Sequence, residues 1–249
     1  MEEIERQTSR GSATTERRWS AAATAIALLG FGVLLVVLPR FFQSFDEAKY
    51  VGIGRNVLAG HGVVTIDGTA FLEHAPLWSV AIVAPSLVLG GNPLDWGHAY
   101  NILAALAFVG LVAAFGWRVR PAAGALAVAV VVGFVYLHDL SRTARLDVPV
   151  AALTLAAVAL GLRAAERQSP AWAVAGGFAF GVAGLVKEVV LPFAPLPLFA
   201  ALLRGVPGRT VVRLGGVMAL TALVTTAWWF IVVASYTGRI YRLGLPASI

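Results

Sequence analysis

The fold is decided by residues 20–38, which read SAAATAIALLGFGVLLVVL and contain no charged side chain. A helix that crosses the hydrocarbon core of a bilayer needs about 20 mostly apolar residues. Arg17 and Arg18 precede the stretch, and residues 39–42 (PRFF) after it do not form a small-residue cleavage site. Because the run is also too long for the core of a signal peptide, we interpret it as an uncleaved membrane anchor whose N-terminus lies inside.

The composition of the whole chain is typical of a protein that is solvated by lipid. Of the 249 residues, 59% are hydrophobic and 13% are charged, whereas an ordinary soluble domain carries about 25% charged residues. Cysteine is absent, which excludes disulfides, thiolate metal sites and a cysteine nucleophile. The net charge of +6 does not predict a nucleic-acid partner, because the Lys and Arg residues lie between the apolar runs.

Further apolar runs predict an all-α, polytopic membrane protein with about seven transmembrane helices. The predicted spans are residues 20–38, 98–117, 122–139, 147–163, 171–187, 189–204 and 214–236. Residues 20–236 are thus expected to form one membrane module. Residues 1–19 are polar and predict a disordered cytoplasmic tail, and residues 237–249 are expected to be an outer-face end at which the chain is truncated.

A shorter apolar segment, residues 76–91, is broken by Pro85, and the positive charges predict whether it crosses. If it does not cross, 11 Lys and Arg residues lie inside and 8 outside; if it does, the numbers are 9 and 10. Lys and Arg are in excess on the cytoplasmic side of membrane proteins. We therefore expect a re-entrant or interfacial segment within a long outer loop, residues 39–97, and a multi-pass protein of the inner (plasma) membrane with a cytoplasmic N-terminus.

In this topology, charged residues with catalytic potential fall on the outer face, although each also has a structural explanation. Asp46 and Glu47 open a predicted interfacial helix that ends at Gly60 and has apolar residues at helical spacing (Tyr50, Ile53, Val57 and Leu58). Residues 44–47 also fit a capping box, in which the acids only stabilise the helix start. Likewise Asp147 fits an N-cap, and Arg145 and Lys187 fit snorkelling cations.

Two further features of the sequence also allow a structural explanation. Glu73 and His74 precede the predicted re-entrant segment and are candidate ligands of a divalent cation or a phosphate, or else an outer-surface polar pair. Gly177, Gly181 and Gly184 have the spacing of helix-packing positions. No P-loop and no strand-linked G-x-G-x-x-G occurs, so no nucleotide cofactor is predicted.

Taken in order along the chain, these features resemble the GT-C glycosyltransferases that use a polyprenyl-phosphate sugar, especially the protein O-mannosyltransferase and lipid A aminoarabinose transferase branches. The similar stretches are residues 46–50 (DEAKY), 56–62 (NVLAGHG), 73–77 (EHAPL), 145–149 (RLDVP), 181–187 (GVAGLVK) and the pair Trp228-Trp229. The resemblance extends over about residues 30–235. It departs from the family at Ala75-Pro76, where the family has Pro-Pro, and at the start of the second span, where a frequent Arg is either replaced by His98 or missing.

The resemblance implies transfer of a sugar, with inversion, from a polyprenyl-phosphate donor to an acceptor hydroxyl on the outer face. It leaves the acceptor open among a lipid, a glycan and a protein. The implied catalytic residues are Asp46, Glu47 and Asp147, the implied substrate-binding residues are Tyr50, His74, Arg145 and Lys187, and the candidate metal ligands are Glu73 and His74. The alternative from another class is a non-enzymatic transporter or a membrane-embedded partner subunit.

Overall fold

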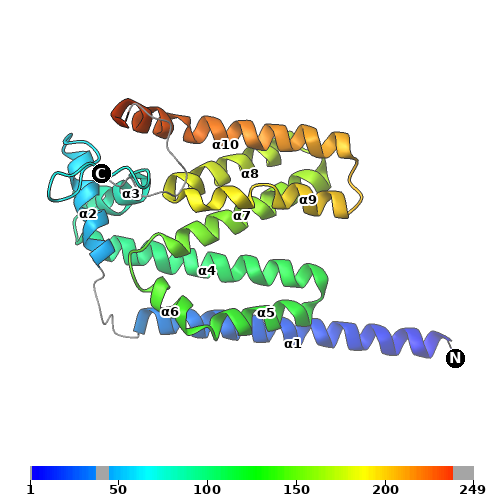
Figure 1. Cartoon of the computed structure of the whole chain (residues 1–249). Helices are drawn as coiled ribbons and strands as arrows, with labels where there is room; N and C mark the ends of the chain where they lie inside the picture. The colour runs from blue at the N-terminus through cyan, green and yellow to red at the C-terminus, as the bar shows by residue number, and fades with distance from the viewer. Residues whose placement is uncertain (1, 38–44, 238–249) are drawn as a thin grey trace.

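The computed structural model describes residues 2–37 and 45–237, which are almost entirely helical (Figure 1). The elements are α1 (Glu2–Val37), α2 (Phe45–Leu58), α3 (Leu77–Leu89), α4 (Pro93–Val119), α5 (Pro121–Val132), α6 (Val135–Ser141), α7 (Asp147–Arg167), α8 (Pro170–Val186), the 3₁₀ helix η1 (Glu188–Phe193), α9 (Leu196–Leu203) and α10 (Gly208–Thr237). The predicted all-α class is confirmed. Residues 38–44, which include Ser44 of the predicted capping box, and residues 238–249 of the predicted outer-face end lie outside the described residues.

The long helices lie side by side, with α1 and α5 on one side of the bundle, α4 and α7 in the middle, and α8 and α10 on the other side (Figure 1). Apolar clusters join the neighbours: one links α1, α4 and α5 around Phe31 and Val109, and another links α7, α8 and α10 around Phe180 and Leu214. Many outward-facing side chains are large and apolar, such as Leu29, which is 70% exposed. An apolar exterior of this extent is typical of a surface that contacts lipid.

The predicted spans correspond to helices of this bundle, and the polytopic architecture is confirmed. Within the described residues, four helices are long and apolar enough to cross a membrane: Thr14–Val37 of α1, α4, α7, and Gly208–Ser235 of α10. A fifth candidate consists of α5 and α6, which meet at a bend of 69°. The predicted spans 171–187 and 189–204 form shorter apolar helices, and the second is interrupted because Pro192 and Pro195 remove backbone donors.

Residues 76–91, which were predicted not to cross, form the short helix α3. At 13 residues, α3 is too short to span a bilayer. It lies beside α2 at the end of the bundle opposite the N-terminus (Figure 1). Trp78, Ile82 and Val83 of α3 are buried in a cluster with Val51 of α2 and Leu146. This position agrees with the predicted re-entrant or interfacial segment.

The N-terminal segment corrects the expectation of a disordered tail, because α1 begins at Glu2 and includes residues 2–19. The segment has no proline, and its Glu and Arg residues are good helix formers. Extending an existing helix avoids the cost of nucleating a new one. The apolar span that follows therefore supplies a helix onto which the polar residues can add.

Small residues allow α8 and α10 to approach closely, as their spacing predicted. A Cβ atom added to Gly177 would lie 2.3 Å from the carbonyl oxygen of Met218, and one added to Gly181 would lie 2.5 Å from the Cβ of Thr225. No side chain larger than hydrogen fits at either position without moving backbone or packed side chains. This contact fixes the position of α8. The C-terminal cap residue of α8, Lys187, therefore lies at the end of the bundle where α2 and α3 lie.

Candidate functional site

Helix α2 begins with two acids whose side chains point in different directions. Consecutive residues of an α-helix are rotated by about 100° around the axis. The face that carries Val51, Ile53 and Gly54 is buried, and Glu47 lies on this face, whereas Asp46 lies on the exposed side. The adjacent acids of the sequence motif therefore have different surroundings.

Helix α2 ends at Leu58, just before the predicted end at Gly60. Gly60 has φ +79° and donates its N–H to the carbonyl of Val57 at 3.1 Å, while His61 donates to the carbonyl of Asn56 at 2.9 Å. These two bonds form a Schellman motif, which requires a left-handed residue that glycine adopts without strain. The chain then turns into the outer loop that carries Glu73 and His74.

Glu47 is completely buried and binds two other segments of the chain. Its Oε1 atom accepts a hydrogen bond from the backbone N–H of Ala144 at 2.6 Å and lies 2.8 Å from Nε2 of His98. Glu47 was predicted to be catalytic, but its side chain is 0% exposed and faces the interior of the protein. We assign Glu47 as a positioning residue that joins α2 to α4 and to the connection between α6 and α7.

The connection between α6 and α7, residues 142–146, is held from three helices, and we call it the anchored loop. In addition to the bond from Glu47 on α2, Asn101 of α4 donates through Nδ2 to the carbonyls of Thr143 and of Arg145, the latter at 3.0 Å. Trp78 of α3 donates to the carbonyl of Ala144 at 3.0 Å. Side chains from three helices thus satisfy four backbone groups of the anchored loop, as a buried connection requires.

A glycine makes this close packing possible. A Cβ atom added to Gly97 of α4 would lie 2.5 Å from the Cβ of Ala144, which is itself 0% exposed. Any side chain at position 97 would push the anchored loop away from α4. The path of the loop into α7, and therefore the position of Arg145 and Asp147, depends on this contact.

Four charged side chains form a continuous row across the end of the bundle. Arg145 contacts Asp46 (Nη2 to Oδ2, 3.3 Å) and Asp147 (Nε to Oδ2, 3.7 Å), and Lys187 contacts Asp147 (Nζ to Oδ1, 3.0 Å). All four are partly exposed, between 33% and 42%. We call this set the charge row: it alternates acid and base, and it joins α2, the anchored loop, α7 and α8.

Two residues of the charge row, Asp147 and Lys187, lie at helix ends that favour the sign of their charges. Asp147 lies in the first turn of α7, and Lys187 is the C-terminal cap residue of α8. Acids near helix N-termini and cations near C-termini interact favourably with the helix dipole. The N-cap predicted at Asp147 is wrong, because Leu146 is the N-cap residue and Asp147 is the first residue of α7. The helix dipoles do not account for the assembly of four charges from four segments at one place.

Tyr50 lies beside the charge row and packs against the cluster formed by α2, α3, α7 and α8. Burial raises the pKa of its phenol well above the usual range, and the neighbouring carboxylates raise it further (Asp46, Asp147 and Glu73). The phenol therefore stays neutral at physiological pH and can donate a hydrogen bond.

Glu73 and His74 are adjacent in sequence but engage different partners. Glu73 pairs with Lys49 at 3.3 Å, and His74 Nδ1 lies 2.9 Å from Oε2 of Glu188, the residue after Lys187. His74 is thus next to the charge row, whereas Glu73 is exposed at its side. In the part of the chain that the structure describes, no three His, Cys, Asp or Glu side chains form a group that could hold a metal ion. The arrangement gives no support to the predicted metal site.

Sequence reasoning did not identify the residues that hold the anchored loop. Asn101 and His98 lie inside or at the edge of a predicted span, where a buried amide or imidazole is unusual. These two polar residues in or next to an apolar span were therefore visible in the sequence as candidates. In contrast, nothing in the sequence indicates that the backbone of Ala144 is the group to which Glu47 binds.

Comparisons with known proteins were consistent with this architecture. A family model described as dolichyl-phosphate-mannose-protein mannosyltransferase matches residues 73–230. The fold is similar to the crystal structure of ArnT from Cupriavidus metallidurans bound to undecaprenyl phosphate, with a TM-score of 0.59 and 23% sequence identity over 89% of this chain and 42% of that chain. The chain thus spans less than half the length of ArnT. No curated protein sequence matches it.

The role of Glu47 can be tested through stability. Glu47→Ala leaves the Ala144 N–H and the His98 imidazole without their buried partner, and each such group costs about 1–3 kcal/mol. We expect a clearly lower midpoint of thermal unfolding in detergent, measured by tryptophan fluorescence. In a double-mutant cycle, Glu47→Ala and His98→Ala should be coupled by about 0.5–3 kcal/mol.

The matched control is Asp46→Ala, the neighbouring acid on the exposed side of α2. Its ion pair with Arg145 is partly exposed, so the loss should be only about 0.2–1 kcal/mol. Equal midpoints for Glu47→Ala and Asp46→Ala would contradict the assignment of Glu47 as the residue that holds the anchored loop.

Proposed function

The chain belongs to the dolichyl-phosphate-mannose-protein mannosyltransferase family, and from this premise we propose that it moves a sugar from a polyprenyl-phosphate donor to an acceptor hydroxyl at the membrane surface. The observation that carries the proposal is the charge row, in which Asp46 and two cations meet at one end of a membrane bundle. We propose this activity for the membrane module of residues 20–236.

The cations of the charge row suit a donor phosphate. Arg145 and Lys187 come from different segments, and each is held in place by a carboxylate. A guanidinium and an ammonium that face the same space bind phosphate oxygens through charge-assisted hydrogen bonds. The undecaprenyl phosphate bound to ArnT, a protein of similar fold, supports a polyprenyl phosphate as the lipid part of the donor.

The proposed reaction is a single displacement at the anomeric carbon. The oxygen of the acceptor hydroxyl attacks that carbon, the bond from carbon to the phosphate oxygen breaks, and its electron pair leaves with the polyprenyl phosphate. Asp46, which is 42% exposed, accepts the proton of the attacking hydroxyl as a general base. Arg145 and Lys187 stabilise the negative charge that develops on the leaving phosphate. Attack from the face opposite the phosphate inverts the anomeric centre.

The remaining site residues have supporting roles in this proposal. Asp147 orients Arg145 and Lys187, Tyr50 offers a neutral hydroxyl beside the row, and His74 offers an imidazole that is tied to Glu188. A divalent metal is not part of the proposal because Glu73 and His74 bind separate partners.

The orientation in the membrane is a further part of the proposal. At the end of the bundle opposite the charge row, the ends of α4, α7 and α9 carry five arginines (Arg118, Arg120, Arg163, Arg167 and Arg204) and one acid, Glu166, within the described residues. Because cytoplasmic ends are enriched in Lys and Arg, this end and the N-terminus face the cytoplasm. The charge row then faces outward across the inner (plasma) membrane.

The buried polar side chains of α4 do not support the alternative hypothesis that the chain is a transporter. His98 and Asn101 are the buried polar residues of α4. His98 contacts Glu47, and Asn101 binds the anchored loop directly. A transporter would instead be expected to use intramembrane polar groups along a substrate path.

The central test of the enzyme proposal is Asp46→Asn. Loss of a general base lowers the rate by about a hundredfold or more. We expect this loss in an assay that follows consumption of polyprenyl-phosphate mannose by membranes containing the overproduced chain. The matched control is Asp67→Asn, a fully exposed acid of the outer loop, which should turn over at the parent rate. An Asp46→Asn variant with parent activity would refute the role of Asp46.

The orientation can be tested with single cysteines, since the chain has none of its own. Asp67→Cys lies in the outer loop, and Gly208→Cys lies at the start of α10, where an added Cβ meets no atom within 4 Å. An impermeant thiol reagent should label Asp67→Cys in intact spheroplasts and label Gly208→Cys only after permeabilisation. The reverse pattern would show the opposite orientation.

A further inference from the structure

The end of the bundle opposite the charge row, which we call the basic end, carries more positive charge than its carboxylates neutralise (Figure 1). Seven arginines of the described residues lie there, at the ends of α4, α7, α9 and α10 (Arg118, Arg120, Arg163, Arg167, Arg204, Arg209 and Arg213). Arg118 and Arg204 share Oε1 of Glu166, at 3.1 and 2.8 Å. Arg120 contacts Glu16 at 3.1 Å. Seven cations and the two glutamates that pair with them give a net charge of +5.

Four of these arginines, Arg163 and Arg167 of α7 and Arg209 and Arg213 of α10, have no ion pair in the part of the chain that the structure describes. The two members of each pair are four residues apart and therefore lie on the same face of their helix. Like charges at this spacing repel each other and destabilise a helix. In the charge row, by contrast, each cation contacts a carboxylate. An anion that binds between the arginines would relieve the repulsion.

The α7 pair lies beside an aromatic ring. The guanidinium of Arg163 lies over the ring of Trp172, the third residue of α8, with Cζ 5.9 Å from the ring centroid. A guanidinium that stacks on an indole uses its flat face and keeps the N–H donors of its edge available. Arg167, one turn further along α7, is exposed. These two sets of donors suit the oxygens of a phosphate, which arginine binds in a bidentate manner.

Exposed tryptophans place the basic end at the depth of lipid headgroups. Trp172 is 40% exposed, and Trp19 of α1 is 72% exposed. Trp19 follows Glu16 by three residues, and Glu16 contacts Arg120, so this ring lies close to the same level. Tryptophan is enriched where the hydrocarbon of a membrane meets water. The arginines therefore lie where the phosphates of phospholipids are found.

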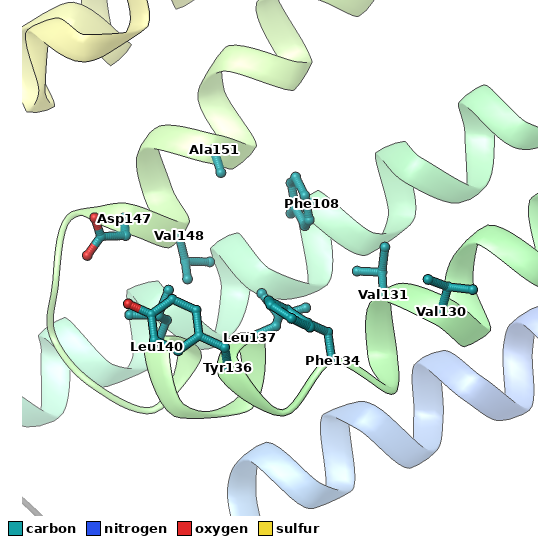
Figure 2. Close-up of a pocket in the computed structure, with 10 residues that line it drawn as sticks. All are labelled: Phe108, Val130, Val131, Phe134, Tyr136, Leu137, Leu140, Asp147, Val148 and Ala151. Carbon is teal, nitrogen blue, oxygen red and sulfur yellow. The ribbon is translucent and has the colours of Figure 1, made fainter.

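Between the basic end and the charge row, the outer surface of the bundle is apolar. Leu29 of α1 and Phe178 of α8 are exposed there. A pocket of about 340 Å³ between α4, α5, α6 and α7 belongs to the same region, and its lining is almost entirely hydrocarbon (Figure 2). A nucleic acid or an acidic protein would contact only the charged end. A phospholipid matches both surfaces, because its acyl chains lie along the hydrocarbon while its headgroup reaches the arginines.

We propose that the basic end binds anionic phospholipids, with one headgroup phosphate held between Arg163 and Arg167 beside Trp172. The ligand is a phosphodiester lipid with a net negative charge, such as phosphatidylglycerol. A zwitterionic lipid also has a phosphate, but its ammonium group is repelled by the unpaired arginines. Basic clusters on the cytoplasmic side of membrane proteins bind anionic headgroups, and the proposed orientation places the basic end on that side. This lipid site is separate from the donor site proposed at the charge row.

The test is native mass spectrometry of the full chain released from nanodiscs that contain phosphatidylglycerol and phosphatidylcholine in equal amounts and with identical acyl chains. We expect the parent to retain phosphatidylglycerol in preference. Arg163→Gln with Arg167→Gln should lower the retained phosphatidylglycerol about tenfold. Arg167→Glu, at an exposed position where no packing is lost, should lower it at least as much. Arg145→Gln with Lys187→Gln removes equal charge at the other end and should retain it like the parent.

Three results would overturn the proposal. Equal retention of the two phospholipids by the parent would show that the arginines do not select an anionic headgroup. Parent-like retention by Arg167→Glu and by the α7 double variant would place the lipid elsewhere. Displacement of phosphatidylglycerol by inorganic phosphate would assign the arginines to a soluble anion. Retention of polyprenyl phosphate by the same samples tests the proposed function separately, because it should fall only in Arg145→Gln with Lys187→Gln.

Discussion

The structure of the site depends on one buried contact, the hydrogen bond from the Ala144 N–H to the Glu47 carboxylate. This carboxylate is removed from water and is stabilised there by the N–H and by His98. Removing one partner of such a buried pair is strongly destabilising, because the other is left without compensation. The contact ties the interfacial helix α2 to the membrane bundle and fixes the start of α7. Asp46 and Arg145, which form one ion pair of the charge row, are each next in sequence to a residue of this contact.

The neighbouring residues Asp46 and Glu47 therefore have different roles. Glu47 faces inward and holds the backbone, while Asp46, one position earlier, faces outward and is available to a substrate. The same division occurs in the anchored loop, where Ala144 is buried and the Arg145 side chain is partly exposed. A rigid support directly behind reactive groups keeps them close to the geometry that catalysis requires.

Periodicity and charge made most of the fold predictable, whereas the contacts inside the site were not. Apolar runs located the helices, and the charge count predicted that residues 76–91 do not cross, which agrees with the short helix α3. The sequence reasoning underestimated Pro192, which interrupts the helix after α8, and treated residues 1–19 as disordered although they can extend α1. Glu47 and Asp46 were both predicted to be catalytic. The sequence does not show how α2 packs on α3 and α4, and this packing determines which of the two acids is buried. The four charged residues were predicted individually, but their convergence depends on the anchored loop.

The central claim is that the charge row binds a lipid phosphate, and the most direct measurement is retention of polyprenyl phosphate in native mass spectrometry. The comparison is between the parent chain, the double variant Arg145→Gln with Lys187→Gln, and Arg118→Gln with Arg204→Gln as a control of equal charge at the opposite end. The account predicts at least about a tenfold loss of retained lipid in the first double variant, which corresponds to about 1.4 kcal/mol, and parent-like retention in the control. Equal retention by all three proteins would contradict it.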